Sequence, residues 1–75
     1  MKPIKQIYME NVTDGHSKFW RGSLFNDETV KTEWGRIGAD NVQFKEFPKA
    51  GADFLEKKVK EKEKKGYVYS EPANR

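Results

Sequence analysis

Closely spaced turn signals divide the first 48 residues into four short segments rich in β-branched and aromatic residues. Asp14-Gly15 is a strong hairpin signal, and residues 26–28 and 38–41 consist largely of turn-forming residues. Pro48 closes the last segment, because proline cannot donate a hydrogen bond to a neighbouring strand. Four strands are therefore predicted, at residues 4–12, 18–25, 29–37 and 42–47.

After Pro48 the pattern changes to that of a single helix, ending near residue 65. Phe54, Leu55 and Val59 form a short apolar stripe, and Gly66 stands where a helix-ending glycine belongs. The start of the helix offers no Ser, Thr or Asp cap. We expect an α+β fold: an antiparallel β-sheet of about four to five strands with one C-terminal helix packed across it. Residues 1–69 form a single predicted domain, and residues 70–75 a flexible C-terminal tail.

Composition removes several classes of function. The chain of 75 residues has no cysteine, so disulfides, thiol catalysis and cysteine-based metal sites are excluded. Its one histidine, His16, cannot build a metal site alone, and no catalytic set or phosphate loop is legible. We predict no enzyme activity, metal, cofactor or small-molecule substrate. Neither a membrane span nor a signal peptide is visible, so we expect a soluble, intracellular protein of the cytoplasm.

The positive charge of the chain is concentrated on the predicted helix. Residues 1–48 hold seven basic and seven acidic side chains, which cancel. Residues 49–66 hold seven lysines against four acids, and this segment carries the whole net charge of +3. A polyanion such as nucleic acid becomes a candidate partner, although a mixed Lys/Glu helix is more often a solvated outer face.

The tripeptide Trp34-Gly35-Arg36 is the strongest candidate binding feature. On a strand, Trp34 and Arg36 point to the same face, and the glycine opposite lets another backbone or a ligand approach. A tryptophan beside a guanidinium suits a sugar or base with an adjacent phosphate. Two interpretations stay open: a ligand surface, or a core tryptophan with the arginine extending past its edge. Trp20 is assigned to the core.

The segment from Thr29 to Gly38, which contains these three residues, resembles the signature of the WGR domain. The order of the remaining elements agrees with that family. Matching segments are the strand Lys18-Phe19-Trp20, the strand 43–47, and the helix end formed by Lys60-Glu61-Lys62 and Lys65-Gly66-Tyr67. The resemblance covers residues 4–69. It departs from the family at Lys58 and Glu63, where standalone members often carry leucine.

The resemblance implies an antiparallel sheet with a helix across it, and a role in contacting DNA. In DNA-dependent poly(ADP-ribose) polymerases this domain binds a DNA break near a 5′ end. Its tryptophan packs on the terminal sugar, and its arginine contacts the DNA end and a partner domain. These roles would fall on Trp34 and Arg36. The family also occurs in small bacterial proteins, and the polymerase activity itself is not implied, because the sequence has no ADP-ribosyltransferase segment.

The sequence therefore predicts a small non-enzymatic module that contacts DNA ends or backbone with little sequence specificity. Its candidate nucleic-acid-binding residues are Trp34, Gly35, Arg36, Arg21, Lys18 and Lys45. Arg21 shares a strand face with Phe19, where it extends a basic site or points into solvent, and Lys31 alternates away from Trp34. The alternative is a protein–protein interaction adaptor using the same Trp/Arg surface, which the low net charge favours.

Overall fold

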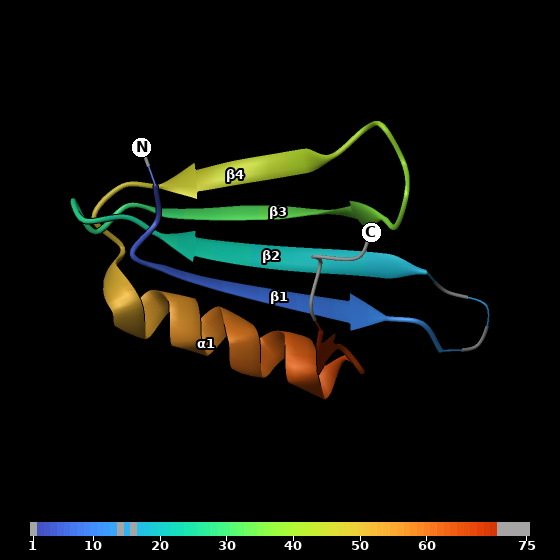
Figure 1. Ribbon diagram of the computed structural model, residues 1–75. Coiled ribbons are helices and arrows are strands. Elements are labelled where there is room, and N and C mark those ends of the chain that lie inside the picture. Colours follow the sequence, from blue (N-terminus) through green and yellow to red (C-terminus); the bar gives the residue numbers. More distant parts are fainter. Residues whose placement is uncertain (1, 14, 16, 71–75) are drawn as a thin grey trace.

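The computed structural model describes residues 2–13, 15 and 17–70, which form one sheet and one helix (Figure 1). The elements are β1 Lys5–Asn11, β2 Lys18–Leu24, β3 Val30–Arg36, β4 Gln43–Phe47, α1 Gly51–Lys64 and β5 Val68–Tyr69. The predicted α+β class is confirmed. No helix in the described part of the chain is long and apolar enough to cross a membrane.

All neighbouring strands are antiparallel, and the sheet order is β4-β3-β2-β1-β5. The first four strands form a meander, as their short connections require. The segment after the helix returns to the sheet, where β5 pairs with β1. Ser70 continues this contact, because its backbone N–H donates to the Tyr8 carbonyl at 3.1 Å. Residues 71–75 of the predicted tail lie outside the described residues.

The register places two tryptophans in one row across the middle of the sheet. Met9 of β1 lies opposite Trp20 of β2, which lies opposite Trp34 of β3. Opposed residues of antiparallel strands share a face, so this row points toward α1. The core lies between that face and the helix, and its buried members are Met9, Trp20, Leu24, Val30, Leu55 and Val59.

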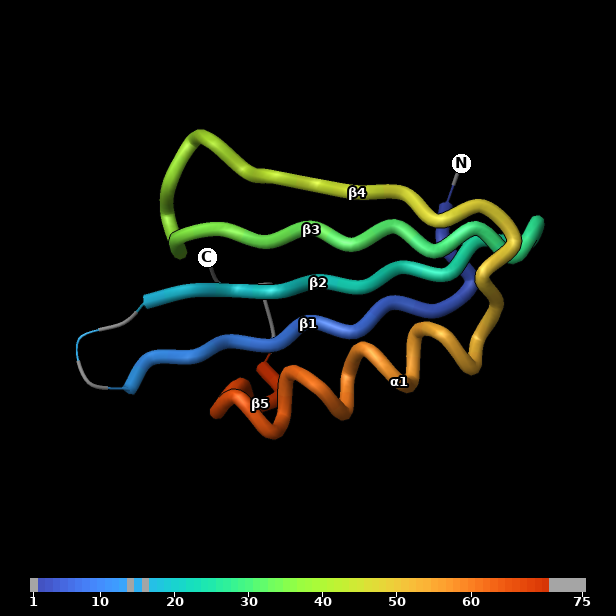
Figure 2. Tube along the Cα trace, turned by 180° about the vertical axis from the view of Figure 1, so that it is seen from behind, coloured from blue at the N-terminus to red at the C-terminus, as the bar shows by residue number. Residues whose placement is uncertain are grey.

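The helix lies mainly over β2 and β3. In both views of the chain, β4 is the strand farthest from α1 (Figures 1 and 2). The β4 side of the sheet therefore extends past the helix, leaving residues Gln43 to Glu46 exposed. This offset between the two layers decides which part of the apolar face stays open to solvent.

The end of the helix follows the prediction closely. Gly66 has a φ of 97°, and its N–H donates to the Glu63 carbonyl at 3.1 Å. The N–H of Tyr67 donates to the Lys62 carbonyl at 3.0 Å, which completes a Schellman motif. At the other end, Ala50 makes no side-chain cap, as its residue type requires. The N–H of Gly51 instead donates to the carbonyl of Glu28, in the turn between β2 and β3.

The predicted turns bound the strands with small shifts. At residues 26–28 the N–H of Glu28 donates to Phe25, and at the next turn Ala39 donates to Arg36. Strand β4 begins at Gln43, one residue later than predicted. Asp14 of the predicted first hairpin lies outside the described residues, as does His16.

Candidate nucleic-acid interface

The two tryptophans of the central row differ in exposure. Trp20 is 2% exposed, which confirms its assignment to the core. Trp34 is half-buried and packs against the edge of that core. The helix covers β2 more completely than the β4 side of the sheet, so one tryptophan is enclosed and its neighbour keeps a free surface. Trp34 therefore supports the core and also lines an open groove, and ligand binding at this surface stays a prediction.

That groove, which we call the Trp34 groove, lies between α1 and the β3–β4 part of the sheet and has a volume of about 270 Å³. Trp20 and Thr32 also line it, together with Phe47. The remaining lining residues are three lysines: Lys45 from β4, and Lys58 and Lys62 from α1. Among the described residues that line the groove, none is a carboxylate. The groove thus combines aromatic surface with positive charge.

Aromatic rings hold the lysine side chains at the groove. The Nζ of Lys45 lies 5.4 Å from the centroid of the Phe47 ring, and the Nζ of Lys58 lies 5.9 Å from it. The Nζ of Lys62 lies 5.5 Å from the Tyr67 ring. Cation–π contacts of this kind restrict where an ammonium group can sit. Burial lowers the pKa of Lys62, and the nearby ammonium groups of Lys65 and Lys58 lower it further.

Arg36 and Lys18 lie beyond Trp34 at one end of the sheet. They occupy directly opposed positions on β3 and β2, and both are exposed. Their register places them on the same face as the two tryptophans. Backbone pairing continues one residue past the strand, since the N–H of Ile37 donates to the Ser17 carbonyl at 2.9 Å. Three positively charged positions of the predicted set, Lys18, Arg36 and Lys45, therefore share the face of Trp34.

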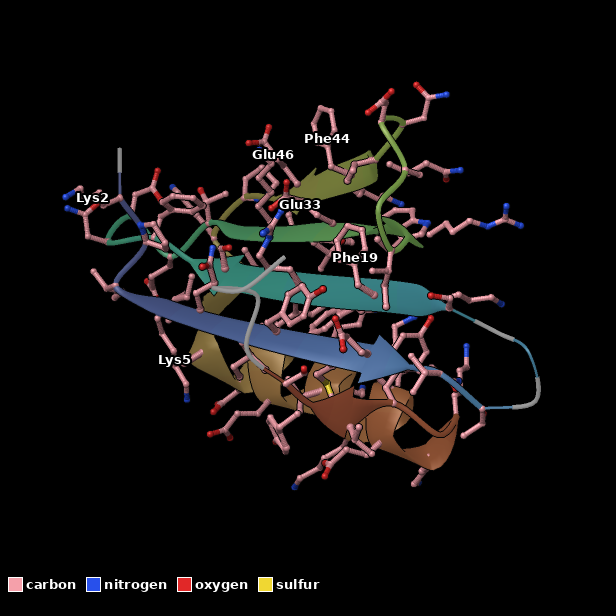
Figure 3. All side chains as sticks on the ribbon, turned by 45° about the vertical axis from the view of Figure 1, so that its right-hand side comes forward. Lys2, Lys5, Phe19, Glu33, Phe44 and Glu46 are labelled. Atoms are coloured by element: carbon pink, nitrogen blue, oxygen red, sulfur yellow. The ribbon has the colours of Figure 1, made fainter. Side chains whose placement is uncertain are left out.

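Arg21 is not brought to that face. It lies on the opposite side of the sheet, with its Nε 3.1 Å from Oε1 of Glu33 and its guanidinium over the Phe19 ring. Figure 3 shows Phe19, Glu33 and Phe44 on the sheet face away from α1. Because an exposed-face carboxylate already pairs with it, Arg21 adds little positive charge to the groove on the other side.

Gly35 also faces away from the groove, as alternation predicted. A Cβ at this position would lie 3.4 Å from the Asn41 carbonyl oxygen and 3.6 Å from the Phe19 ring. Both distances are ordinary contacts, so Gly35 lies against the β3–β4 connection on the far face of the sheet and does not line the groove.

Lys58 and Lys62 were not among the predicted site residues. In the sequence they flank the apolar stripe of Phe54, Leu55 and Val59, where a long lysine stem usually leads to solvent. Their spacing of four residues placed both on one side of the helix, but it gave no sign of which strands lie opposite. The position of α1 over the sheet supplies that information.

A small α+β domain with an aromatic, lysine-rimmed groove beside an exposed arginine belongs to the class of binding modules. The family model of the WGR domain matches residues 5–74. The chain therefore belongs to the WGR domain family, a family of small nucleic-acid-binding modules. No curated protein and no solved structure matches the chain.

Proposed function

We propose that this protein binds DNA at ends or along the backbone, with Trp34 and Arg36 as the principal contacts. The observation that carries the proposal is the half-buried Trp34, which keeps an open surface on the same face as the exposed Arg36. A tryptophan that is fixed by the core on one side offers a rigid platform on the other. Membership of a nucleic-acid-binding family supports this role.

The chemistry of the two side chains suggests how a strand end is held. The Trp34 ring stacks on a sugar or terminal base, an interaction that every nucleotide offers. The Arg36 guanidinium donates two parallel hydrogen bonds to a phosphate. Neither contact reads a base edge in the major groove, so we expect little sequence preference.

Two lysines support these contacts from the same face. Lys18 lies opposite Arg36 in the register, and Lys45 lines the groove next to Trp34. Both lysines attract the phosphate backbone over a long range. This attraction weakens as the salt concentration rises. Gly35 faces the β3–β4 connection on the opposite face of the sheet, so we assign it no direct contact with DNA.

The test measures fluorescence anisotropy of a short labelled duplex with a 5′-phosphate, at two salt concentrations. We expect Trp34→Ala to weaken binding by about 5-fold to 150-fold, since stacking contributes about 1–3 kcal/mol per base, and Arg36→Gln to weaken it by a similar factor, since a charged hydrogen bond contributes about 1.5–3 kcal/mol. Phe44→Ala is the matched control, because it removes an exposed aromatic ring from the neighbouring strand on the opposite face.

Two results would overturn the proposal. Folded Trp34→Ala and Arg36→Gln variants that bind DNA as tightly as the unmodified chain would remove both contacts from the interface. An unmodified chain with no measurable affinity at low salt would favour the protein–protein adaptor instead. Capping both ends of the duplex separates the two DNA modes: end binding is lost, and backbone binding is retained.

A further inference from the structure

The lysines of α1 separate into two groups that the sequence does not distinguish. Lys58 and Lys62 are half-buried and line the Trp34 groove, whereas Lys57, Lys60 and Lys64 are exposed. A spacing of four residues stacks Lys58 and Lys62 on one side of the helix. Nearly all lysines on such a helix normally extend into water, so a half-buried pair facing a groove calls for an explanation.

Two of the three ammonium groups at the groove come from different elements and approach the same ring. Lys45 of β4 and Lys58 of α1 both place Nζ within 5.9 Å of the Phe47 centroid. Phe54 packs against Phe47 at a centroid distance of 4.7 Å, and the Nζ of Lys58 lies 5.4 Å from its ring as well. The positions of these charges are thus set by the packing between helix and sheet.

Little negative charge offsets this cluster. Among the described residues, one carboxylate forms an ion pair with the cluster: Oε2 of Glu61 lies 3.7 Å from the Nζ of Lys58, at the half-exposed rim of the groove. The groove on the other side of the helix is different. There Lys5 and Lys60 are accompanied by Glu56 and Glu63, so positive and negative charges balance. The Trp34 groove alone of these two has an excess of positive charge.

We propose that the Trp34 groove is a phosphate subsite, in which Lys45, Lys58 and Lys62 hold a backbone phosphate of the bound nucleic acid. The inference rests on the proposed function and adds a second phosphate contact to the one made by Arg36. An anion between the lysines offsets the mutual repulsion of their charges. Burial already removes part of the hydration of the Lys62 ammonium group, which strengthens its contact with a phosphate oxygen.

The subsite also defines the path of the bound nucleic acid strand across the protein. Along β3, Arg36 lies on one side of Trp34, and Thr32, which pairs with Lys45, lies on the other. A nucleic acid strand whose sugar stacks on Trp34 therefore places one phosphate near Arg36 and another, on the far side of Trp34, near the helix lysines. Arg36 and Thr32 lie four residues apart on β3, so their backbone positions are separated by about 13 Å, which the long arginine and lysine side chains shorten.

Salt dependence tests the subsite, because each lost phosphate contact lowers the slope of log K against log salt by about one. Because three lysines share this phosphate, we expect Lys58→Gln and Lys62→Gln each to reduce the slope by a fraction of that amount, and the triple variant with Lys45→Gln to reduce it by about one. Lys60→Gln and Lys64→Gln remove the same charge from exposed positions of the same helix and should leave the slope unchanged. Lys58→Arg and Lys62→Arg should restore it, which separates a charge contact from a packing effect.

The outcomes distinguish this inference from the proposed function. If Trp34→Ala weakens binding while the groove variants Lys58→Gln and Lys62→Gln keep the salt slope of the unmodified chain, the subsite is wrong and the DNA-binding proposal stands. If the exposed controls lower the slope as much as the groove variants do, the helix contributes only diffuse charge, and the subsite is again wrong. If Trp34→Ala and the groove variants all bind normally, both proposals fail.

Discussion

At the scale of single residues, the difference between Trp20 and Trp34 carries most of the functional argument. Both have the same residue type, both lie on strands, and they oppose each other directly in the register. Their different exposure comes from the helix, which encloses one ring and leaves part of the other open. The position of α1 therefore decides which of the two tryptophans is enclosed in the core and which keeps an open surface.

Gly22 marks the point of closest packing between sheet and helix. A Cβ at this position would lie 2.5 Å from Cδ1 of Leu55 and 2.6 Å from Cη2 of Trp20. We expect Gly22→Ala to lower the free energy of unfolding by about 1–3 kcal/mol, because the core cannot absorb the extra methyl group without strain. Urea denaturation measures the free energy of unfolding of the variant and of the unmodified chain. Gly35→Ala, whose Cβ has ordinary contacts, is the control, and equal losses for both variants would contradict the packing described.

Through Asp27, the stability of the turn after β2 depends on pH. The backbone N–H of Thr29 donates to its Oδ1 at 3.0 Å, and this bond, with a further one from the Thr29 side chain, lowers the pKa of the carboxyl below its usual 3.8. A carboxyl whose pKa is lower in the folded state stabilises the protein above its unfolded pKa. That contribution disappears as pH falls through the folded pKa.

We therefore expect Asp27→Asn to be less stable than the unmodified chain at neutral pH, with the difference shrinking as pH falls well below 3.8. Comparing the two chains isolates this group from the other carboxyls that titrate in the same range. The measurement is the urea unfolding midpoint of each chain, at neutral pH and at a pH well below 3.8. A difference that is the same at neutral and acid pH would show that the charge of Asp27 has no part in the turn.

Alternation along the strands predicted the faces of individual residues well. Trp34 and Arg36 share a face, and Lys31 lies on the other, where its Nζ is 5.0 Å from the Phe44 ring. The degree of burial of Trp34 was beyond prediction, because it depends on how far the helix reaches across the sheet. The partner of Arg21 was also missed, since Glu33 lies twelve residues away and meets it only through strand pairing.

At the scale of elements, the strands and the helix were predictable because local chemistry and tertiary packing agree. Turn-forming residues bound each strand, and a glycine ends the helix in the conformation that glycine alone adopts without cost. The start of the helix was less certain for a physical reason. Its first N–H groups have no side-chain cap, and one of them finds a partner at Glu28, far away in the sequence.

The Schellman motif at Gly66 offers a test at this scale. Its φ of 97° is unfavourable for any side chain, and a Cβ there would also lie 3.4 Å from Nδ2 of Asn11. We expect Gly66→Ala to lower the free energy of unfolding by about 1–2 kcal/mol. Lys64→Ala, in the last turn of the same helix, should change it by only a few tenths of a kcal/mol. Thermal unfolding compares them, and an unaffected Gly66→Ala would contradict the helix end.

At the scale of the whole molecule, two faces of one sheet have different character. The face under α1 holds the core and, at its β4 side, the aromatic groove with its lysines. The other face carries ion-paired and ring-covered charges, among them Arg21 with Glu33 and Lys31 over Phe44. The net charge of +3 is small, so its uneven distribution matters more to binding than its total.

Lys45 and Lys31 provide the most direct test of the claim that DNA binds on the Trp34 face. They lie on neighbouring strands, on opposite faces of the sheet. Lys45→Gln and Lys31→Gln each remove one positive charge, so the two variants differ only in the face that loses it. The measurement is the salt dependence of binding to a 5′-phosphorylated duplex. We expect Lys45→Gln to weaken binding and lower the salt slope measurably, with Lys31→Gln close to the unmodified chain. A Lys31→Gln variant that loses as much affinity and slope as Lys45→Gln would place the interface elsewhere.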